Sequence, residues 1–132
     1  MKRAIIAGLI AGFASGIVMF IFHISGWWDL LSIYPLHEPI DMHIILIFNI
    51  IQNTIWGVLF GIFFAMIYDH VPAIGVKKGL VYGLIIWIIS LIRIPVIIAM
   101  HGAYTWAIPW IIVGFFSIAI TYGLLIGYLY KK

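Results

Sequence analysis

Residues 43–68 read HIILIFNIIQNTIWGVLFGIFFAMIY, and this stretch decides the fold. It contains no Asp, Glu, Lys or Arg, and its length exceeds the roughly 20 residues that a helix needs to cross the hydrocarbon core of a bilayer. A lone strand is excluded, because it would leave backbone amides unpaired in hydrocarbon, and the stretch lacks the alternating polarity of a barrel strand. The sequence therefore predicts a membrane-spanning helix over 43–68.

Three further runs have the same character, at 4–24, 79–100 and 110–130, with a single charged residue, Arg93, inside them. The whole chain is 66% hydrophobic and 8% charged, whereas soluble domains carry about 25% charged residues. The first run is too long for the apolar region of a signal peptide and lacks the polar end of one. We predict an all-α fold, a four-transmembrane-helix bundle forming one integral membrane domain over residues 1–132.

The basic residues predict the orientation of the bundle. Six of the seven form pairs at the two chain ends and between the second and third runs, whereas the loops after the first and third runs hold no Lys or Arg; the pairs are Lys2 with Arg3, Lys77 with Lys78, and Lys131 with Lys132. Loops rich in Lys and Arg stay on the cytoplasmic side. We therefore expect a multi-pass protein of the cell membrane with both termini in the cytoplasm.

The two halves of the chain resemble each other. Residues 2–10 read KRAIIAGLI and residues 77–85 read KKGLVYGLI. The second and fourth spans each carry an aromatic residue followed by two glycines four apart, at 56–61 and 122–127. Two interpretations stay open. The chain is either two repeated helical hairpins in the same orientation, as in transporters with parallel repeats, or two pairs of helices of similar composition.

Glycines recur at helical spacing along the spans. The first span has Gly8, Gly12 and Gly16, and the later spans have two pairs, Gly57 with Gly61 and Gly123 with Gly127. In lipid, helices associate mainly through close packing and hydrogen bonds, which small residues permit. The glycines thus predict helix contacts, either within one chain or between chains.

Polar residues inside the spans predict a pocket. The residues in question are Asn49, Gln52, Asn53, Ser90 and Arg93. The three amides and Trp56 share one helix face by their spacing, and Arg93 lies about 22 Å along a helix from Lys78, at a depth close to that of Asn49. The alternative is that the amides form ordinary interhelical hydrogen bonds, and that Arg93 is paired or extends to the membrane surface.

Acids and histidines gather on the outer side. They are His23, His37, Glu38, Asp41, His43 and His101. Imidazole with carboxylate suits zinc, copper or nickel, and histidines also carry protons near neutral pH. The sequence therefore predicts an outer metal site, although the spacings match no defined metal motif. The alternative to a metal site is that the histidines lie at the membrane surface and the acids are loop residues. In that case Glu38 or Asp41 would neutralise Arg93.

Several functions lack their motifs. The chain has no cysteine, which excludes thiolate metal sites and disulfides. Its glycines form no phosphate-binding loop, and the histidines lie near helix ends, where a buried haem would not be held. We expect that the protein is not an enzyme and has no nucleic-acid partner, and the sequence indicates no cofactor. Two functions remain: binding or passing a small polar solute, proton or metal ion as a homo-oligomer, or serving as an accessory subunit of a larger membrane protein.

Overall fold

The computed structural model describes residues 2–24, 42–92, 95 and 107–130. These residues form four α-helices and one short 3-10 helix, with no strand among them: α1 (Lys2–Ile24), α3 (Met42–Ile67), η1 (Tyr68–His70), α4 (Val76–Ser90) and α6 (Ala107–Leu129). The predicted all-α helical bundle is confirmed. The third span is predicted over 79–100, and the helix α4 covers its first part, ending at Ser90. Most of the remaining residues of this span lie outside the described ranges.

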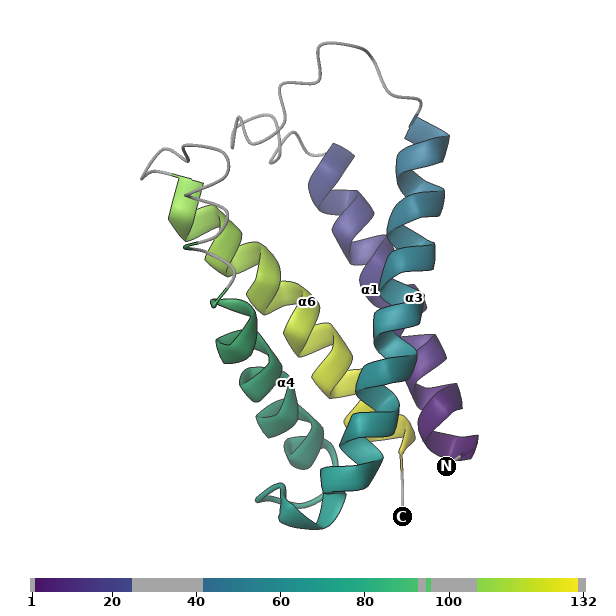
Figure 1. The fold of residues 1–132 in the computed structure, drawn as a ribbon, viewed down its shortest axis with the longest axis vertical. Coiled ribbons are helices and arrows are strands. Elements are labelled where there is room, and N and C mark those ends of the chain that lie inside the picture. The colour runs from purple at the N-terminus through teal and green to yellow at the C-terminus, as the bar shows by residue number, and fades with distance from the viewer. Residues whose placement is uncertain (1, 25–41, 93–94, 96–106, 131–132) are drawn as a thin grey trace.

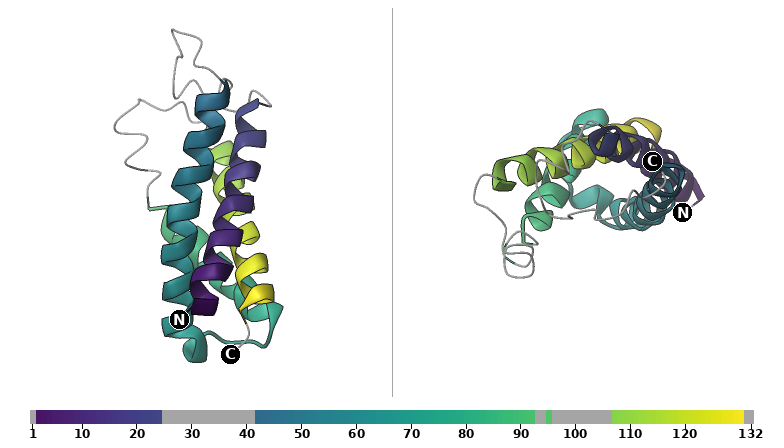
Figure 2. Two further views of the ribbon diagram at one scale, coloured as in Figure 1. Left: turned by 90° about the vertical axis from the view of Figure 1, so that its right-hand side faces the viewer. Right: turned by 90° about the horizontal axis from the view of Figure 1, so that it is seen from above.

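The bundle consists of two antiparallel hairpins, α1 with α3 and α4 with α6 (Figure 1). The helices α1 and α4 begin at the same end of the bundle, so the hairpins have the same orientation (Figure 1). The helix α1 also packs against α6, and this contact joins the hairpins. The helices α3 and α4 follow one another in the chain, yet they diverge from the turn that connects them (Figures 1 and 2).

Glycines bring the backbones of α1 and α3 into contact. Gly8 packs against Gly57, and Gly12 packs against Asn53. A Cβ atom added at Gly12 would lie 2.5 Å from the Asn53 carbonyl oxygen, well inside the ordinary contact distance of about 3.5 Å. No residue larger than glycine fits there unless the helices separate.

The second hairpin uses the same device. Gly79 of α4 packs against Gly123 and Gly127 of α6, and a Cβ added at Gly79 would lie 2.5 Å from Gly127 Cα. One turn along, a Cβ at Gly83 would lie 2.6 Å from the Ala119 carbonyl oxygen. The glycines that the sequence singled out therefore make contacts within one chain.

The contacts also define which positions of the two hairpins correspond. Gly8 against Gly57 in the first hairpin has its counterpart in Gly79 against Gly123 in the second. The sequence similarity pairs Gly8 with Gly83 instead, which is one helical turn away. The pattern of glycine contacts is common to both hairpins. When the hairpins are aligned by these contacts, the pair Lys2 and Arg3 does not correspond to the pair Lys77 and Lys78.

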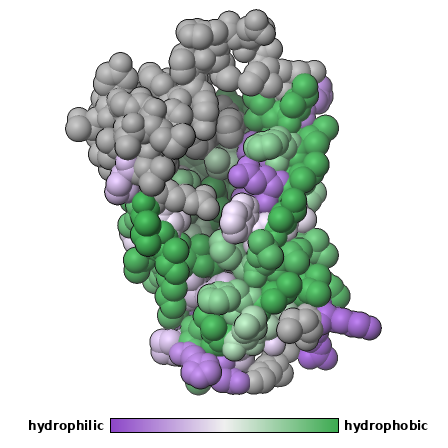
Figure 3. Space-filling model, viewed as in Figure 1, coloured by the Kyte–Doolittle hydropathy of each residue, from purple (hydrophilic) through white to green (hydrophobic). Residues whose placement is uncertain are grey.

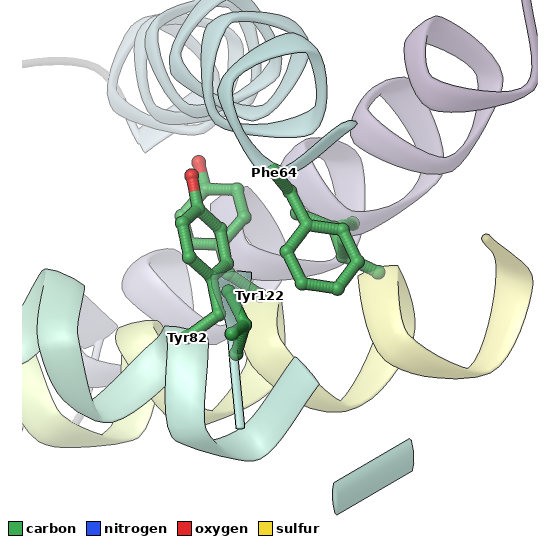
Figure 4. Packing of buried hydrophobic residues seen from close by; sticks show 6 residues of the cluster. Phe64, Tyr82 and Tyr122 are labelled. Carbon is green, nitrogen blue, oxygen red and sulfur yellow. The ribbon is translucent and has the colours of Figure 1, made fainter. Parts of the chain in front are cut away.

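Aromatic residues fill the end of the bundle that holds both chain termini. The buried Phe64 ring lies 4.8 Å from the Tyr82 ring and 5.7 Å from that of Tyr130, centroid to centroid. Lys78 Nζ donates a hydrogen bond of 2.6 Å to the Tyr68 carbonyl oxygen and lies 4.1 Å from the centroid of the Tyr68 ring. Edge-on ring contacts and the cation above a ring each add to the stability of this end. Figure 4 shows Phe64 with Tyr82 and Tyr122 at the core of the cluster.

Within the described residues, three helical segments are long and apolar enough to cross a membrane: Lys2–Phe22, Met42–His70 and Ile112–Leu129. Their outward faces carry large apolar side chains, such as Phe48 at 64% exposure and Ile44 at 60%. Water would disfavour apolar patches of this extent, whereas lipid accepts them. The fold therefore indicates association with a membrane.

Candidate functional site: a cavity between the two hairpins

A cavity of about 320 Å³ lies between the hairpins. Three of the five predicted pocket residues line it, namely Gln52, Asn53 and Ser90, whereas Arg93 lies outside the described residues. All four helices contribute to the wall, which consists of Met19 from α1, Gln52, Asn53, Trp56, Phe60 and Phe63 from α3, Tyr82, Ile85, Ile86, Ile89 and Ser90 from α4, and Phe115, Ile118, Ala119 and Tyr122 from α6.

The cavity opens between α3 and α4. Several of its lining side chains are also exposed on the outside of the bundle, among them Trp56 at 38%, Phe63 at 50% and Ile89 at 57%. Figure 3 shows hydrophilic side chains in a hollow between the apolar surfaces of these helices. Gln52 is ten residues from the start of α3, about 15 Å along a helix. The opening therefore lies near the middle of α3, a helix long and apolar enough to cross a membrane.

Asn49 does not share the cavity with its predicted neighbours. It is only 3% exposed, and its carbonyl oxygen lies 3.0 Å from the position of a Cβ added at Gly16, so this turn of α3 packs against α1. Its carbonyl also accepts a 2.9 Å hydrogen bond from Asn53 Nδ2. The helix face expected to carry a single polar cluster is thus divided: Asn49 packs between α1 and α3, while Gln52, Asn53 and Trp56 line the cavity.

Two tyrosines that sequence reasoning did not assign to the site connect the hairpins across the cavity. Tyr122 Oη donates to the Asn53 carbonyl oxygen at 2.5 Å, and Tyr82 Oη donates to the Phe60 carbonyl oxygen at 2.8 Å. Both hydroxyls point toward α3 in Figure 4. A usable signal was present, because each tyrosine directly precedes an interface glycine. A residue in that position lies at the edge of the close contact and reaches the next helix.

Most of the hydroxyl protons in the cavity wall are already used. Ser90 Oγ donates to the Trp87 carbonyl oxygen at 2.6 Å, and Tyr82 and Tyr122 donate to α3 as described above. Their oxygens keep free lone pairs and can accept further hydrogen bonds. Gln52 makes no hydrogen bond with a described residue, so its amide offers both a donor and an acceptor. The described lining contains no Asp, Glu, His, Lys or Arg.

Ser15 of α1 is a buried polar residue near this network. It has no exposed surface, and its hydroxyl has no hydrogen-bond partner among the described residues. The hydroxyl lies near that of Tyr122, outside hydrogen-bonding geometry. An unsatisfied buried hydroxyl costs about 1–3 kcal/mol. Among the described residues, the Ser15 hydroxyl thus makes no hydrogen bond that would offset the cost of its burial.

The predicted outer metal cluster falls mostly outside the described residues, which do not include His37, Glu38, Asp41 or His101. His43 is exposed in the first turn of α3, and of His23 only the backbone, in α1, is described. In the described part of the chain, no three His, Cys, Asp or Glu side chains form a group that would hold a metal ion. The outer cluster stays a prediction.

Comparison of the chain with family models, curated proteins and solved structures found no match.

Proposed function

We propose that the protein is a multi-pass cell-membrane protein that binds a small solute in the cavity between its two hairpins. The observation that carries this proposal is a cavity of about 320 Å³ whose mainly apolar wall includes the polar side chains of Asn53 and Ser90, with the exposed Gln52 also in its lining. Pockets for small molecules measure roughly 300–1,000 Å³ and combine apolar walls with a few polar groups. A polar group in an apolar environment is unfavourable without a hydrogen-bond partner, and the Gln52 amide has no such partner among the described residues.

Binding is favoured over continuous passage. The end of the bundle that holds both termini is filled by aromatic side chains, and Phe64 and Tyr82 there are 0% and 1% exposed. A solute in the cavity would have to displace these rings to leave by that end. Transport would therefore need the hairpins to move apart, or a homo-oligomer with a path between chains.

The accessory-subunit alternative is not favoured by the glycine contacts. It relied on glycine faces that dock a larger membrane protein, but nine glycines pack against helices of this chain; they are Gly8, Gly12, Gly16, Gly57, Gly61, Gly79, Gly83, Gly123 and Gly127. Gly114 is different, because a Cβ added there would meet nothing within 4 Å. One glycine in open space is weak support for a docking face.

The cavity is tested with a photoreactive probe, a trifluoromethyl-diazirinyl benzyl alcohol, on the protein in lipid nanodiscs. We expect saturable labelling of the residues that line the cavity, and competition by unlabelled benzyl alcohol. Ile86→Trp should abolish the labelling because Ile86 lines the cavity. Ile88→Trp is the matched control, since Ile88 lies on the same helix, is 59% exposed and is not part of the lining.

Labelling that is not saturable, or that is equal in the two tryptophan variants, would overturn the proposal. The variants must first give the same circular dichroism and elution volume as the unmodified protein. If Ile86→Trp fails this check, Ile118→Trp replaces it, because Ile118 lines the same cavity from α6.

The proposed orientation has its own test. The chain has no cysteine, so single-cysteine variants can be labelled without background. A membrane-impermeant maleimide should label Glu38→Cys in intact cells, and Lys77→Cys only after permeabilisation. The reverse pattern would show that the termini lie outside the cytoplasm.

A further inference from the structure

From the hydrogen-bonding groups of the cavity, we infer that the solute is an uncharged amphiphile whose polar group donates a hydrogen bond, such as a hydroxyl attached to an apolar body. This inference rests on the proposed function, because it assumes that the cavity between the hairpins is a binding site. It deepens that proposal by naming the class of ligand.

The described wall offers no charged side chain that would pair with an ion, and this favours an uncharged ligand. None of the described lining residues is an Asp, Glu, His, Lys or Arg. An ionised group without a partner is strongly disfavoured in an apolar environment, and the opening between α3 and α4 faces the region that acyl chains would occupy. An uncharged ligand avoids that penalty and can also reach the opening through the bilayer.

The direction of the existing hydrogen bonds selects a donor. The hydroxyls of Tyr82, Tyr122 and Ser90 have each given their proton to a backbone carbonyl. What they offer a ligand is therefore lone pairs, which accept but do not donate. Gln52 and Asn53 are among the side chains with spare donors. Asn53 donates one of its two side-chain N–H groups to the Asn49 carbonyl oxygen. The wall thus has more spare acceptors than donors, and a ligand with an O–H or N–H group matches it.

The rest of the cavity matches an apolar body. Trp56 and Phe60 stack with their ring centroids 5.7 Å apart, and the Phe60 ring meets the Tyr122 ring edge-on at 5.4 Å. These rings form a wall that accepts a flat or branched apolar group, since apolar and aromatic surfaces favour burial against one another.

The experiment compares the benzyl alcohol probe with its methyl ether, which has nearly the same shape but no donor. Each is used as a competitor of photolabelling in nanodiscs, at concentrations corrected for its measured partition into empty nanodiscs. We expect the alcohol to compete about threefold to tenfold more strongly, which corresponds to one additional net hydrogen bond. Ser90→Ala should reduce this preference, although it keeps the shape of the wall.

Ser117→Ala is the matched control for that variant. Ser117 Oγ also donates to a carbonyl of its own helix, that of Val113, at 3.0 Å, but Ser117 does not line the cavity. The alcohol preference should therefore be unchanged in Ser117→Ala. Tyr82→Phe provides a second cavity variant in case Ser90→Ala does not fold.

Equal competition by the alcohol and the ether at the cavity would overturn this inference and leave the proposed function standing. Loss of saturable labelling by both probes would overturn the two together. The same ligand chemistry has two sources, a lipid of the bilayer or a free small molecule. Competition by diacylglycerol built into the nanodisc would identify the lipid source, whereas competition by benzyl alcohol alone would identify the free molecule.

Discussion

Replacing Gly57 by alanine should force the first hairpin apart. A Cβ at this position would lie 2.6 Å from Gly12 Cα and 2.7 Å from Gly12 N. Ordinary contacts between carbon atoms are about 3.5–4.0 Å, so α1 and α3 must separate by roughly 1 Å at this point. The neighbouring atoms are backbone and cannot rotate away. Overpacking of this kind costs about 1–3 kcal/mol, and we expect the upper part of that range.

Helix propensity opposes this effect, because alanine is favoured over glycine in a helix by up to about 1 kcal/mol. Gly114→Ala measures that term alone, since Gly114 has nothing within 4 Å of an added Cβ. We therefore expect Gly57→Ala to lower the free energy of unfolding by about 1–2 kcal/mol, and Gly114→Ala to leave it unchanged or raise it by up to about 1 kcal/mol.

The assay is equilibrium unfolding in mixed micelles with an increasing mole fraction of dodecyl sulfate, followed by tryptophan fluorescence. The predicted quantity is the difference in unfolding free energy between the two variants, about 1–3 kcal/mol. A difference below about 0.5 kcal/mol, the usual effect of a surface substitution, would refute the close glycine contact between α1 and α3.

Two further stability predictions follow from the cavity wall and its surroundings. Tyr122→Phe removes the hydrogen bond to the Asn53 carbonyl and should lower the free energy of unfolding by about 0.5–1.5 kcal/mol. Tyr128→Phe is its control, because Tyr128 is 63% exposed. Equal effects of the two variants on stability would contradict the hydrogen bond that connects the hairpins. Ser15→Ala removes a buried hydroxyl that has no partner among the described residues, so the same unfolding assay should find it neutral or stabilising by up to about 1 kcal/mol. A loss of stability above that size would mean that the Ser15 hydroxyl has a partner in the folded protein.

Much of the local architecture follows directly from the chain. Apolar length and the absence of charge predict helices such as α3, because a segment in lipid must satisfy its backbone groups internally. The spacing of Gly8, Gly12 and Gly16 predicts a close contact, because residues four apart lie on one face of a helix. Both predictions are properties of single segments, so they need no knowledge of the neighbouring helix.

The polar site was predicted in part. Gln52, Asn53 and Ser90 do line one cavity, as their depth in the spans indicates. Asn49 shares their helix face by sequence but packs between α1 and α3, because α1 covers that turn of α3 whereas Tyr122 of α6 reaches α3 one turn further along, at Asn53. Spacing along one helix does not tell which neighbour each turn faces. Whether the hairpins descend from a duplication stays a prediction.

The sequence by itself determined that the chain forms apolar helices with glycine-lined faces, since these follow from local composition and the helical period. Only the tertiary structure decided that the glycines pair within one chain, with Gly8 against Gly57 and Gly79 against Gly123. It alone also decided that Tyr82 and Tyr122 reach across to carbonyls of α3 and border a cavity. The physical reason is that a cavity arises from the angle at which two hairpins diverge, and that angle depends on contacts between residues far apart in the sequence.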